Sequence, residues 1–130
     1  MTETLAKGIQ RICQAYGKDR TRMMDIIREV QEAFGYVSEE ATNLIAREVS
    51  APRVDVESVV TFYSFYSDRP KGKVVIRLCN DIIDQMYGCE KVAAAFSQEL
   101  GAAFGQTTAD GKITLDYTPC IGRCDPAPAA

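Results

Sequence analysis

The spacing of apolar residues changes at a polar segment, residues 67–72, which divides the chain into two halves. Before this segment, apolar residues recur every three or four positions, the period of a helix packed along one side. After it, short runs rich in valine, isoleucine and threonine surround one helical stretch, a pattern typical of strands around a helix. The sequence therefore predicts an α+β fold, with an N-terminal helical bundle over residues 1–66 and an α/β unit over residues 73–130.

Four helix-like stretches make up the first half, at about residues 4–16, 20–34, 38–49 and 56–66. Asp19 and Asp55 are placed to cap the second and fourth helices, because an aspartate side chain accepts hydrogen bonds from the free amides of a first turn. The fourth stretch is apolar on almost every side, which predicts a helix buried on more than one face. That helix lies either in the core of the bundle or partly against a partner protein.

The second half reads as strand, helix and strand, with elements expected at residues 73–78, 90–100 and 112–117. Asp110-Gly111 precedes the last strand and is typical of a hairpin turn. Residues 80–88 show no regular period and are expected to form a loop.

Four of the five cysteines fall where these elements begin or end: Cys79, Cys89, Cys120 and Cys124. Cys79 and Cys120 follow the two strands, and if these strands are neighbours in the sheet they lie about 5 Å apart, so both thiols could reach one site. Cys124 returns after a short turn, and Cys89 opens the helix, where the helix dipole favours a thiolate. Four thiolates suit a [2Fe–2S] cluster or a tetrahedral zinc ion, although zinc sites usually contain a tighter Cys-x-x-Cys pair. We predict that these four cysteines form one metal site.

The fifth cysteine, Cys13, lies on the apolar stripe of the first helix together with Ile9, Ile12 and Tyr16. We expect it to pack as a small buried hydrophobe in the helical core.

The composition narrows the chemistry further. The chain has no histidine, which excludes Ser-His and Cys-His catalysis, Cys₂His₂ zinc sites and Rieske-type clusters. It has no glycine-rich nucleotide-binding loop, and its net charge of −3 argues against a nucleic-acid-binding surface. No apolar run approaches the roughly 20 residues that span a membrane, and the polar N-terminus is unlike a secretory signal. We therefore expect a cytoplasmic protein, in which thiols stay reduced and more often bind metal than form disulfides.

Three stretches together point to a known family: Glu29–Val37, Val60–Phe65 and Thr118–Asp125. With these residues the chain resembles the thioredoxin-like [2Fe–2S] ferredoxins. Members of that family form the 24-kDa subunit of respiratory NADH dehydrogenase and open the diaphorase subunit of NAD-reducing nickel–iron hydrogenases. The resemblance covers nearly the whole chain, and the segment containing Cys120 and Cys124 is its most specific part.

The resemblance implies an electron-transfer module within an NAD(H)-dependent oxidoreductase complex, of the hydrogenase or the NADH dehydrogenase type. The module would carry one [2Fe–2S] cluster and dock on a flavoprotein that binds FMN and NADH, with further iron–sulfur or hydrogenase subunits as partners. The resemblance implies no catalytic residue, and no FMN or NAD site, in this region itself.

The sequence departs from the family in two places. The family's first cysteine pair is Cys-x₄-Cys, and the fifth residue after Cys79 is Asp84. The cluster therefore has Cys89 as a substitute ligand, is held by Asp84, or is lost. The chain also ends at Ala130, where relatives continue, so we expect its thioredoxin-like unit to be incomplete at the C-terminus. Two other functions stay open: a docking or structural module with a degenerate cluster site, and a zinc or thiol redox module.

Overall fold

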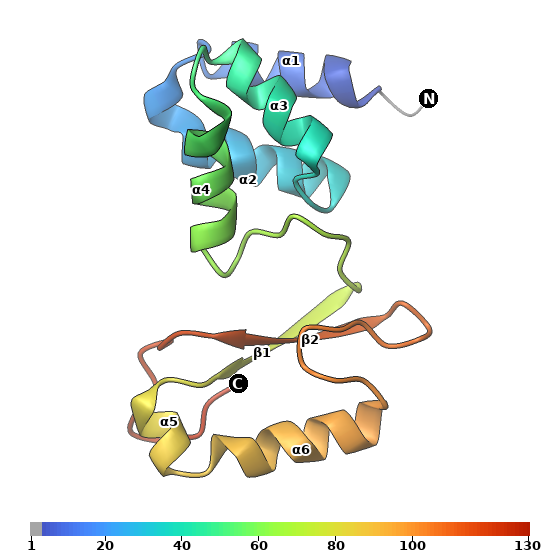
Figure 1. Ribbon diagram of the computed structural model, residues 1–130, viewed down its shortest axis with the longest axis vertical. Helices are drawn as coiled ribbons and strands as arrows, with labels where there is room; N and C mark the ends of the chain where they lie inside the picture. Colours follow the sequence, from blue (N-terminus) through green and yellow to red (C-terminus); the bar gives the residue numbers. More distant parts are fainter. Residues whose placement is uncertain (1–3) are drawn as a thin grey trace. The chain divides into compact units, whose positions relative to one another are not determined.

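A computed structural model describes residues 4–130, and the chain divides between Pro70 and Lys71 into two compact units. The first unit holds helices α1 to α4, and the second holds two strands with helices α5 and α6 (Figure 1). Helices combined with a parallel sheet are the α+β class predicted from the sequence. No helix within residues 4–130 is both long and apolar enough to cross a membrane.

The helices of the first unit are α1 (Leu5–Ala15), α2 (Met23–Phe34), α3 (Glu39–Glu48) and α4 (Arg53–Phe62), with a 3₁₀ turn at Arg20–Arg22. All four predicted helices are present, and of the two predicted caps Asp19 is confirmed and Asp55 is wrong. Asp19 caps the 3₁₀ turn that opens the predicted stretch 20–34 and leads into α2, accepting the Thr21 N–H at 2.8 Å. Because α4 already begins after Pro52, Asp55 lies inside its first turn.

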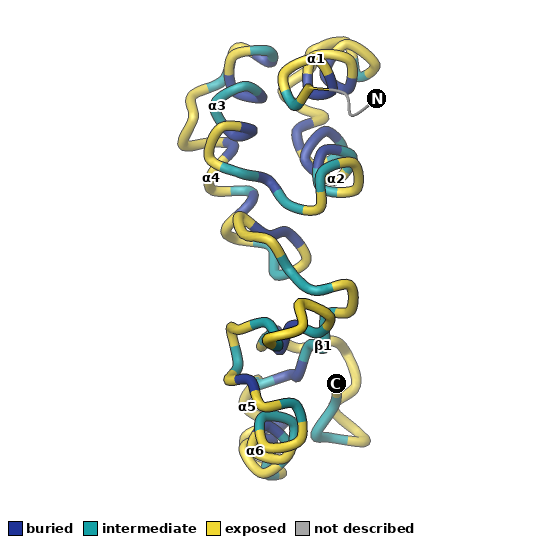
Figure 2. The backbone as a smooth tube through the Cα atoms, turned by 90° about the vertical axis from the view of Figure 1, so that its right-hand side faces the viewer, coloured by how far each residue is buried: buried dark blue, intermediate teal, exposed yellow. Residues whose placement is uncertain are grey.

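The core of the first unit forms where the apolar stripes of its helices meet, as the buried stretches in Figure 2 show. The buried side chains are Ile9, Ile12, Cys13, Met23, Ile26, Ile27, Val30, Val37, Ala41, Ile45, Ala46, Val49, Val56, Val60 and Tyr66. Cys13 is fully buried among them, which confirms its predicted place in the helical core. Burial of such a core is the main source of the stability of a helical unit of this size.

The expectation of a fourth helix buried on several faces is wrong. Helix α4 ends at Phe62, whose side chain is 80% exposed, and Phe65 beyond it is 49% exposed. The buried residues of α4 are Val56 and Val60. Tyr66 is also buried, but it lies beyond the C-terminal end of the helix. The Tyr66 hydroxyl is satisfied inside the unit, because it donates to the Met24 carbonyl oxygen at 2.8 Å.

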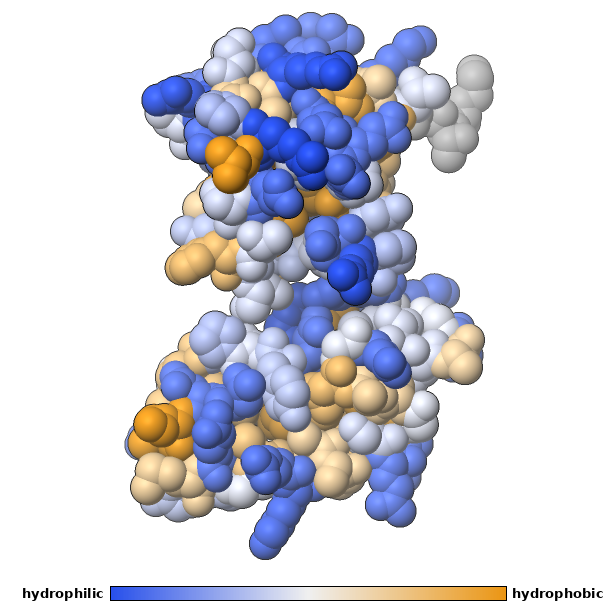
Figure 3. All heavy atoms as spheres, in the orientation of Figure 1, coloured by the Kyte–Doolittle hydropathy of each residue, from blue (hydrophilic) through white to orange (hydrophobic). Residues whose placement is uncertain are grey.

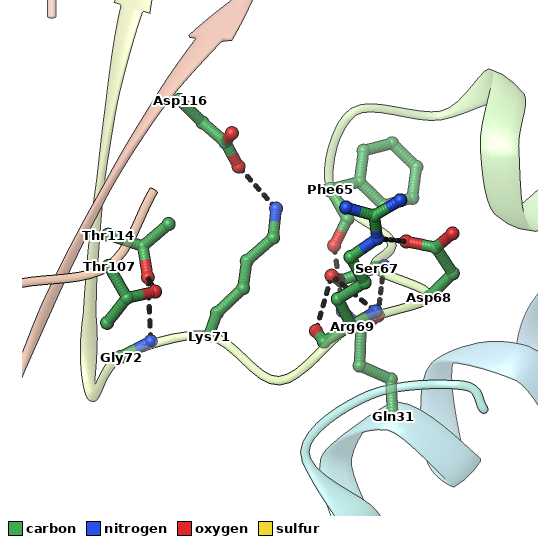
Figure 4. A network of polar contacts seen from close by, with 10 residues as sticks. All are labelled: Gln31, Phe65, Ser67, Asp68, Arg69, Lys71, Gly72, Thr107, Thr114 and Asp116. Atoms are coloured by element: carbon green, nitrogen blue, oxygen red, sulfur yellow. Dashed lines mark hydrogen bonds and ion pairs between the residues drawn. The ribbon is translucent and has the colours of Figure 1, made fainter. Parts of the chain in front are cut away.

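Gln31 fastens the segment after α4 to α2 within the first unit (Figure 4). Its amide nitrogen donates to the Phe65 carbonyl oxygen at 2.7 Å, and its amide oxygen accepts the Ser67 N–H at 2.7 Å. The Ser67 carbonyl oxygen in turn accepts the Val37 N–H at 2.8 Å. These bonds join the two helical motifs that carry the family resemblance.

The second unit contains β1 (Val74–Cys79), α5 (Ile82–Met86), α6 (Cys89–Leu100) and β2 (Ile113–Thr118). The strands pair in parallel, with Val74 opposite Ile113 and Cys79 opposite Thr118. Residues 105–108 pair with the other edge of β2 through an antiparallel bridge between Thr107 and Thr114. That bridge confirms the predicted hairpin around Asp110-Gly111. Helix α6 packs on one face of the sheet, where Ala93 and Leu78 belong to one buried cluster.

The segment that leads into β1 is held close to β2 by Gly72 and Lys71 (Figure 4). The Gly72 N–H donates to the Thr114 hydroxyl at 2.7 Å, and the Lys71 ammonium forms an ion pair with Asp116. A Cβ atom at position 72 would lie 2.6 Å from the Lys112 carbonyl oxygen. Only glycine fits this close approach of two backbones.

Candidate metal centre

The candidate site lies at the carboxyl ends of the two parallel strands. The register places Cys79, the last residue of β1, level with Thr118 at the end of β2. The Asn80 N–H continues the pairing to the Thr118 carbonyl oxygen at 3.2 Å, and Cys120 follows two residues later. Parallel pairing therefore brings the segments that carry Cys79 and Cys120 to one edge of the sheet, as the sequence predicted.

Cys120 and Cys124 form one pair of donors. Their sulfur atoms lie 3.4 Å apart, and both residues are exposed. The turn between them needs glycine at position 122, where φ is +74°, and the Gly122 N–H donates to Cys120 Sγ at 3.4 Å. The hydrogen bond with Cys120 and its charge raise the pKa of Cys124, and the charges of Asp84 and Cys79 act in the same direction. The pKa of Cys124 therefore responds to Cys79 at the end of β1 and to Asp84 in the segment that follows it.

Cys79 and Asp84 form a second, buried pair. Cys79 Sγ lies 3.0 Å from Asp84 Oδ2, and each residue is 1% exposed. Burial, followed by the hydrogen bond with Asp84, raises the pKa of Cys79, and hydrogen bonds from the backbone amides of Asp81 and Ile121 oppose that shift. Ile121 belongs to the turn between Cys120 and Cys124, so this turn acts on the pKa of Cys79 as well.

Helix α5 turns Asp84 toward Cys79, and it corrects the expectation that residues 80–88 form a loop. The Asp81 side chain caps this short helix by accepting the Ile82 N–H at 2.8 Å, and the Gln85 side chain donates to the Asn80 carbonyl oxygen at 2.7 Å. With the helix anchored at both points, Asp84 projects inward, to the end of β1.

The C-terminal segment closes the site from the other side. The Ala129 N–H donates to Asp84 Oδ1 at 2.9 Å, and the Ala129 carbonyl oxygen accepts the Cys79 N–H at 2.9 Å. The hydrogen bonds from the Cys79 thiol and then the Ala129 amide lower the pKa of Asp84. The backbone of Ala129 gives no signal in the sequence, because main-chain donors and acceptors are the same in every residue type.

Cys89, the first residue of α6, has a different environment. It is buried in an apolar cluster with Leu78 and Ala93, against which Val92 and Phe104 pack. Among the described residues its thiol makes no hydrogen bond to the other four cysteines. The convergence of Cys89 with Cys79, Cys120 and Cys124 on one metal stays a prediction.

The donors at this edge of the sheet are arranged as two pairs. In the range 4–130, no three cysteine, aspartate or glutamate side chains are grouped closely enough to hold a single metal ion. One pair is Cys79 with Asp84, and the other is Cys120 with Cys124.

Comparison with known proteins matches this chain to one family model, described as thioredoxin-like [2Fe–2S] ferredoxin, over residues 9–130. The chain is 36% identical over 121 residues to the alpha subunit of the NAD-reducing hydrogenase HoxS of Cupriavidus necator, covering 93% of this chain and 20% of that one. It is also 36% identical over 129 residues to the E subunit of the NADH-quinone oxidoreductase of Pseudomonas aeruginosa, covering 99% of this chain and 78% of that one.

Among solved structures, the fold is similar to that of a NAD⁺-reducing [NiFe]-hydrogenase in the air-oxidized state, with a TM-score of 0.66 at 20% sequence identity. That match covers 83% of this chain and 18% of the hydrogenase chain. The chain therefore spans about a fifth of the hydrogenase proteins that it matches, and most of the length of the matched NADH-quinone oxidoreductase protein. Its sequence, its fold and its paired donors agree, and the chain belongs to the family of thioredoxin-like [2Fe–2S] ferredoxins.

Proposed function

We propose that this chain is an electron-transfer module that carries one [2Fe–2S] cluster within an NAD(H)-dependent oxidoreductase complex. The observation that carries the proposal is that two parallel strands bring the buried Cys79 and the segment with the Cys120–Cys124 pair to one edge of the sheet. The module performs no bond chemistry of its own, because the cofactor does the redox work and the protein binds and tunes it.

The paired donors fit the ligand requirement of this cofactor. A [2Fe–2S] cluster takes four protein ligands, two on each iron. Two thiolates on one tetrahedral metal, with bonds of about 2.3 Å, lie about 3.8 Å apart. The Cys120 and Cys124 sulfur atoms lie 3.4 Å apart, so a small opening of their turn fits them to one iron. The pair that contains Cys79 would hold the other iron.

The surrounding backbone stabilises the sulfur ligands and excludes water from one of them. The amide of Gly122 donates to Cys120 at 3.4 Å, and the backbone amides of Asp81 and Ile121 act to lower the pKa of Cys79. Hydrogen bonds to cluster sulfur raise the reduction potential, because they stabilise the additional negative charge of the reduced state. The bound cluster supplies reversible one-electron transfer, and the exposed Cys120 and Cys124 form the side on which electrons enter or leave.

The partner in this proposal is a flavoprotein that binds FMN and NADH. Figure 3 shows strongly apolar side chains over α5, and Ile82 and Met86 of this helix are 69% and 76% exposed. These residues flank Asp84 in the sequence, so the apolar surface borders the site. Exposed apolar surface beside an electron-transfer site is a natural contact for a partner protein. Further iron–sulfur or hydrogenase subunits would complete the complex.

We further propose that the two units act as two domains, a helical one over residues 1–66 and the cluster-bearing one over 73–130, and that the complex works in the cytoplasm. The helical domain then serves in assembly, because the cluster donors all come from the second domain.

The test is anaerobic purification of the full chain, followed by analysis of iron, acid-labile sulfide and zinc. We expect about two iron and two sulfide per chain and an electron paramagnetic resonance signal that develops on reduction. Stoichiometric zinc without sulfide would support a zinc module. A chain purified with neither iron nor zinc would support a docking module. Either outcome would overturn the proposed electron-transfer function.

A further inference from the structure

Asp84 occupies the position in the site that a fourth thiolate would fill. Building on the proposed function, we propose that the Asp84 carboxylate is the fourth ligand of the cluster, binding the same iron as Cys79 through Oδ2. The cluster would then have three sulfur ligands and one oxygen ligand from the protein.

The burial of Asp84 is the first argument. An ionised carboxylate is costly to bury unless it is paired with positive charge or fully hydrogen-bonded. Asp84 is 1% exposed, within residues 4–130 no lysine or arginine forms an ion pair with it, and its two oxygens accept one bond each, from a neutral thiol and from a backbone amide. A metal ion is the kind of positive charge that such a buried carboxylate lacks.

The orientation of the two carboxylate oxygens is the second argument. Oδ1 is held by the Ala129 N–H at 2.9 Å, as the outer oxygen of a metal-binding carboxylate commonly is. Oδ2 faces Cys79 Sγ at 3.0 Å. A sulfur and an oxygen on one tetrahedral metal, with bonds of about 2.3 Å and 2.0 Å, lie about 3.5 Å apart. A movement of about half an ångström therefore converts this contact into a ligand pair.

Backbone support is the third argument. Asp84 lies on α5, which is capped by the Asp81 side chain and held to the Asn80 carbonyl oxygen by the Gln85 side chain. The Asp84 side chain is therefore oriented toward Cys79 before any metal binds. Such preorganisation is expected of a ligand position, because a ligand must be held close to its productive geometry.

Cys89 has none of these features. Its neighbours Leu78 and Ala93 are apolar, and a cysteine in such surroundings behaves as a small hydrophobe. Cys89 is therefore the matched control residue: a free, buried thiol in the same unit, outside the proposed ligand set.

The test uses the full chain, purified anaerobically, as wild type and as the variants Asp84→Cys, Asp84→Ala and Cys89→Ala. Iron and sulfide content, the visible spectrum and Mössbauer spectra of the oxidised cluster are measured, and circular dichroism checks folding. We expect two resolved Mössbauer doublets in the wild type and in Cys89→Ala, because one iron has an oxygen ligand and the other has none. In Asp84→Cys the doublets should converge at unchanged iron content, and in Asp84→Ala most of the iron should be lost.

Three results would overturn the assignment: identical spectra for wild type and Asp84→Cys, full iron content in Asp84→Ala, or loss of the cluster in Cys89→Ala alone. Iron in Asp84→Cys but not in the wild type would also overturn it, by showing that Asp84 prevents cluster binding at an otherwise competent site. Absence of iron from the wild type and from every variant would instead overturn the proposed function itself, together with the ligand assignment.

Discussion

Gln31 and Ser67 are 36 positions apart in the sequence and are joined by a hydrogen bond of 2.7 Å from the Ser67 N–H to the Gln31 side chain. The same side chain donates to the Phe65 carbonyl oxygen, so one amide group satisfies two main-chain groups of a segment without regular structure. Irregular segments depend on such contacts, because they lack the internal bonds of helices and strands.

We expect Gln31→Ala to lower the free energy of unfolding by about 1–2 kcal/mol, since the Ser67 N–H loses its partner in a partly buried place and the Phe65 carbonyl oxygen loses its partner at the surface. Chemical denaturation followed by circular dichroism measures the change. Gln14→Ala is the matched control, because Gln14 lies exposed on α1 and should tolerate the change. Equal stability of the Gln31 variant and the wild type would show that this contact is unimportant.

The regular elements could be predicted from the sequence because their signals are long and local. Helices of ten or more residues repeat an apolar stripe several times, and β1 and β2 are rich in β-branched residues. Helix α5 could not be found in this way, since five residues give little more than one turn. The exposure of Phe62 was also missed, because apolarity alone does not tell a core residue from a surface one.

The candidate site could be predicted only in part, for a related reason. Parallel strands of known order bring Cys79 and Cys120 to one edge, and this inference needs only the strand pattern. The contact of Cys79 with Asp84 depends on a turn of helix between them, so sequence spacing alone left Asp84 and Cys89 as alternatives. The Ala129 and Ile121 amides belong to the backbone and carry no residue-type signal.

Gly72→Ala should destabilise the second unit. The added methyl group would lie 2.6 Å from the Lys112 carbonyl oxygen and 2.7 Å from the Ile113 nitrogen, and both atoms belong to the backbone of the neighbouring segment. Overpacking of this kind costs about 1–3 kcal/mol, because strands must separate to relieve it. Urea denaturation of Gly72→Ala and of the exposed neighbour variant Lys73→Ala measures the difference. A loss of stability no greater than that of Lys73→Ala would contradict the close approach.

The buried Cys13 predicts a pH dependence of the first unit. Burial, with a further contribution from the charge of Glu48, raises the pKa of Cys13 from its ordinary value of 9.0 to about 11. The unfolded chain releases this proton near pH 9 and the folded chain only near pH 11. The stability that Cys13 contributes is therefore complete below pH 9 and is lost as the pH rises through about 11, a change of about 3 kcal/mol.

The measurement is the free energy of unfolding between pH 8 and about pH 11, in the wild type and in Cys13→Ala. Only the slopes are compared, because the alanine variant also loses packing. We expect the free energy of unfolding to decline less steeply with pH in the variant, since the two proteins differ only at position 13. Parallel slopes would mean that the Cys13 thiol ionises equally well in the folded and unfolded states.

The surface over α5 leads to the last prediction, which concerns electron transfer to the proposed flavoprotein partner. Ile82 and Met86 are exposed apolar residues on the helix that carries Asp84. A charged side chain at the centre of an apolar contact is costly to desolvate, so Met86→Lys should weaken docking by at least about tenfold. The matched control is Val74→Lys, because Val74 is also apolar and 55% exposed but begins the strand that Cys79 ends.

The assay is NADH-driven reduction of the cluster, followed by its visible absorbance, in a mixture with the FMN- and NADH-binding flavoprotein. Iron content should be equal in both variants, while the rate at limiting concentration should fall in Met86→Lys alone. If Val74→Lys slowed the reaction and Met86→Lys did not, the docking surface would lie at the opposite end of β1.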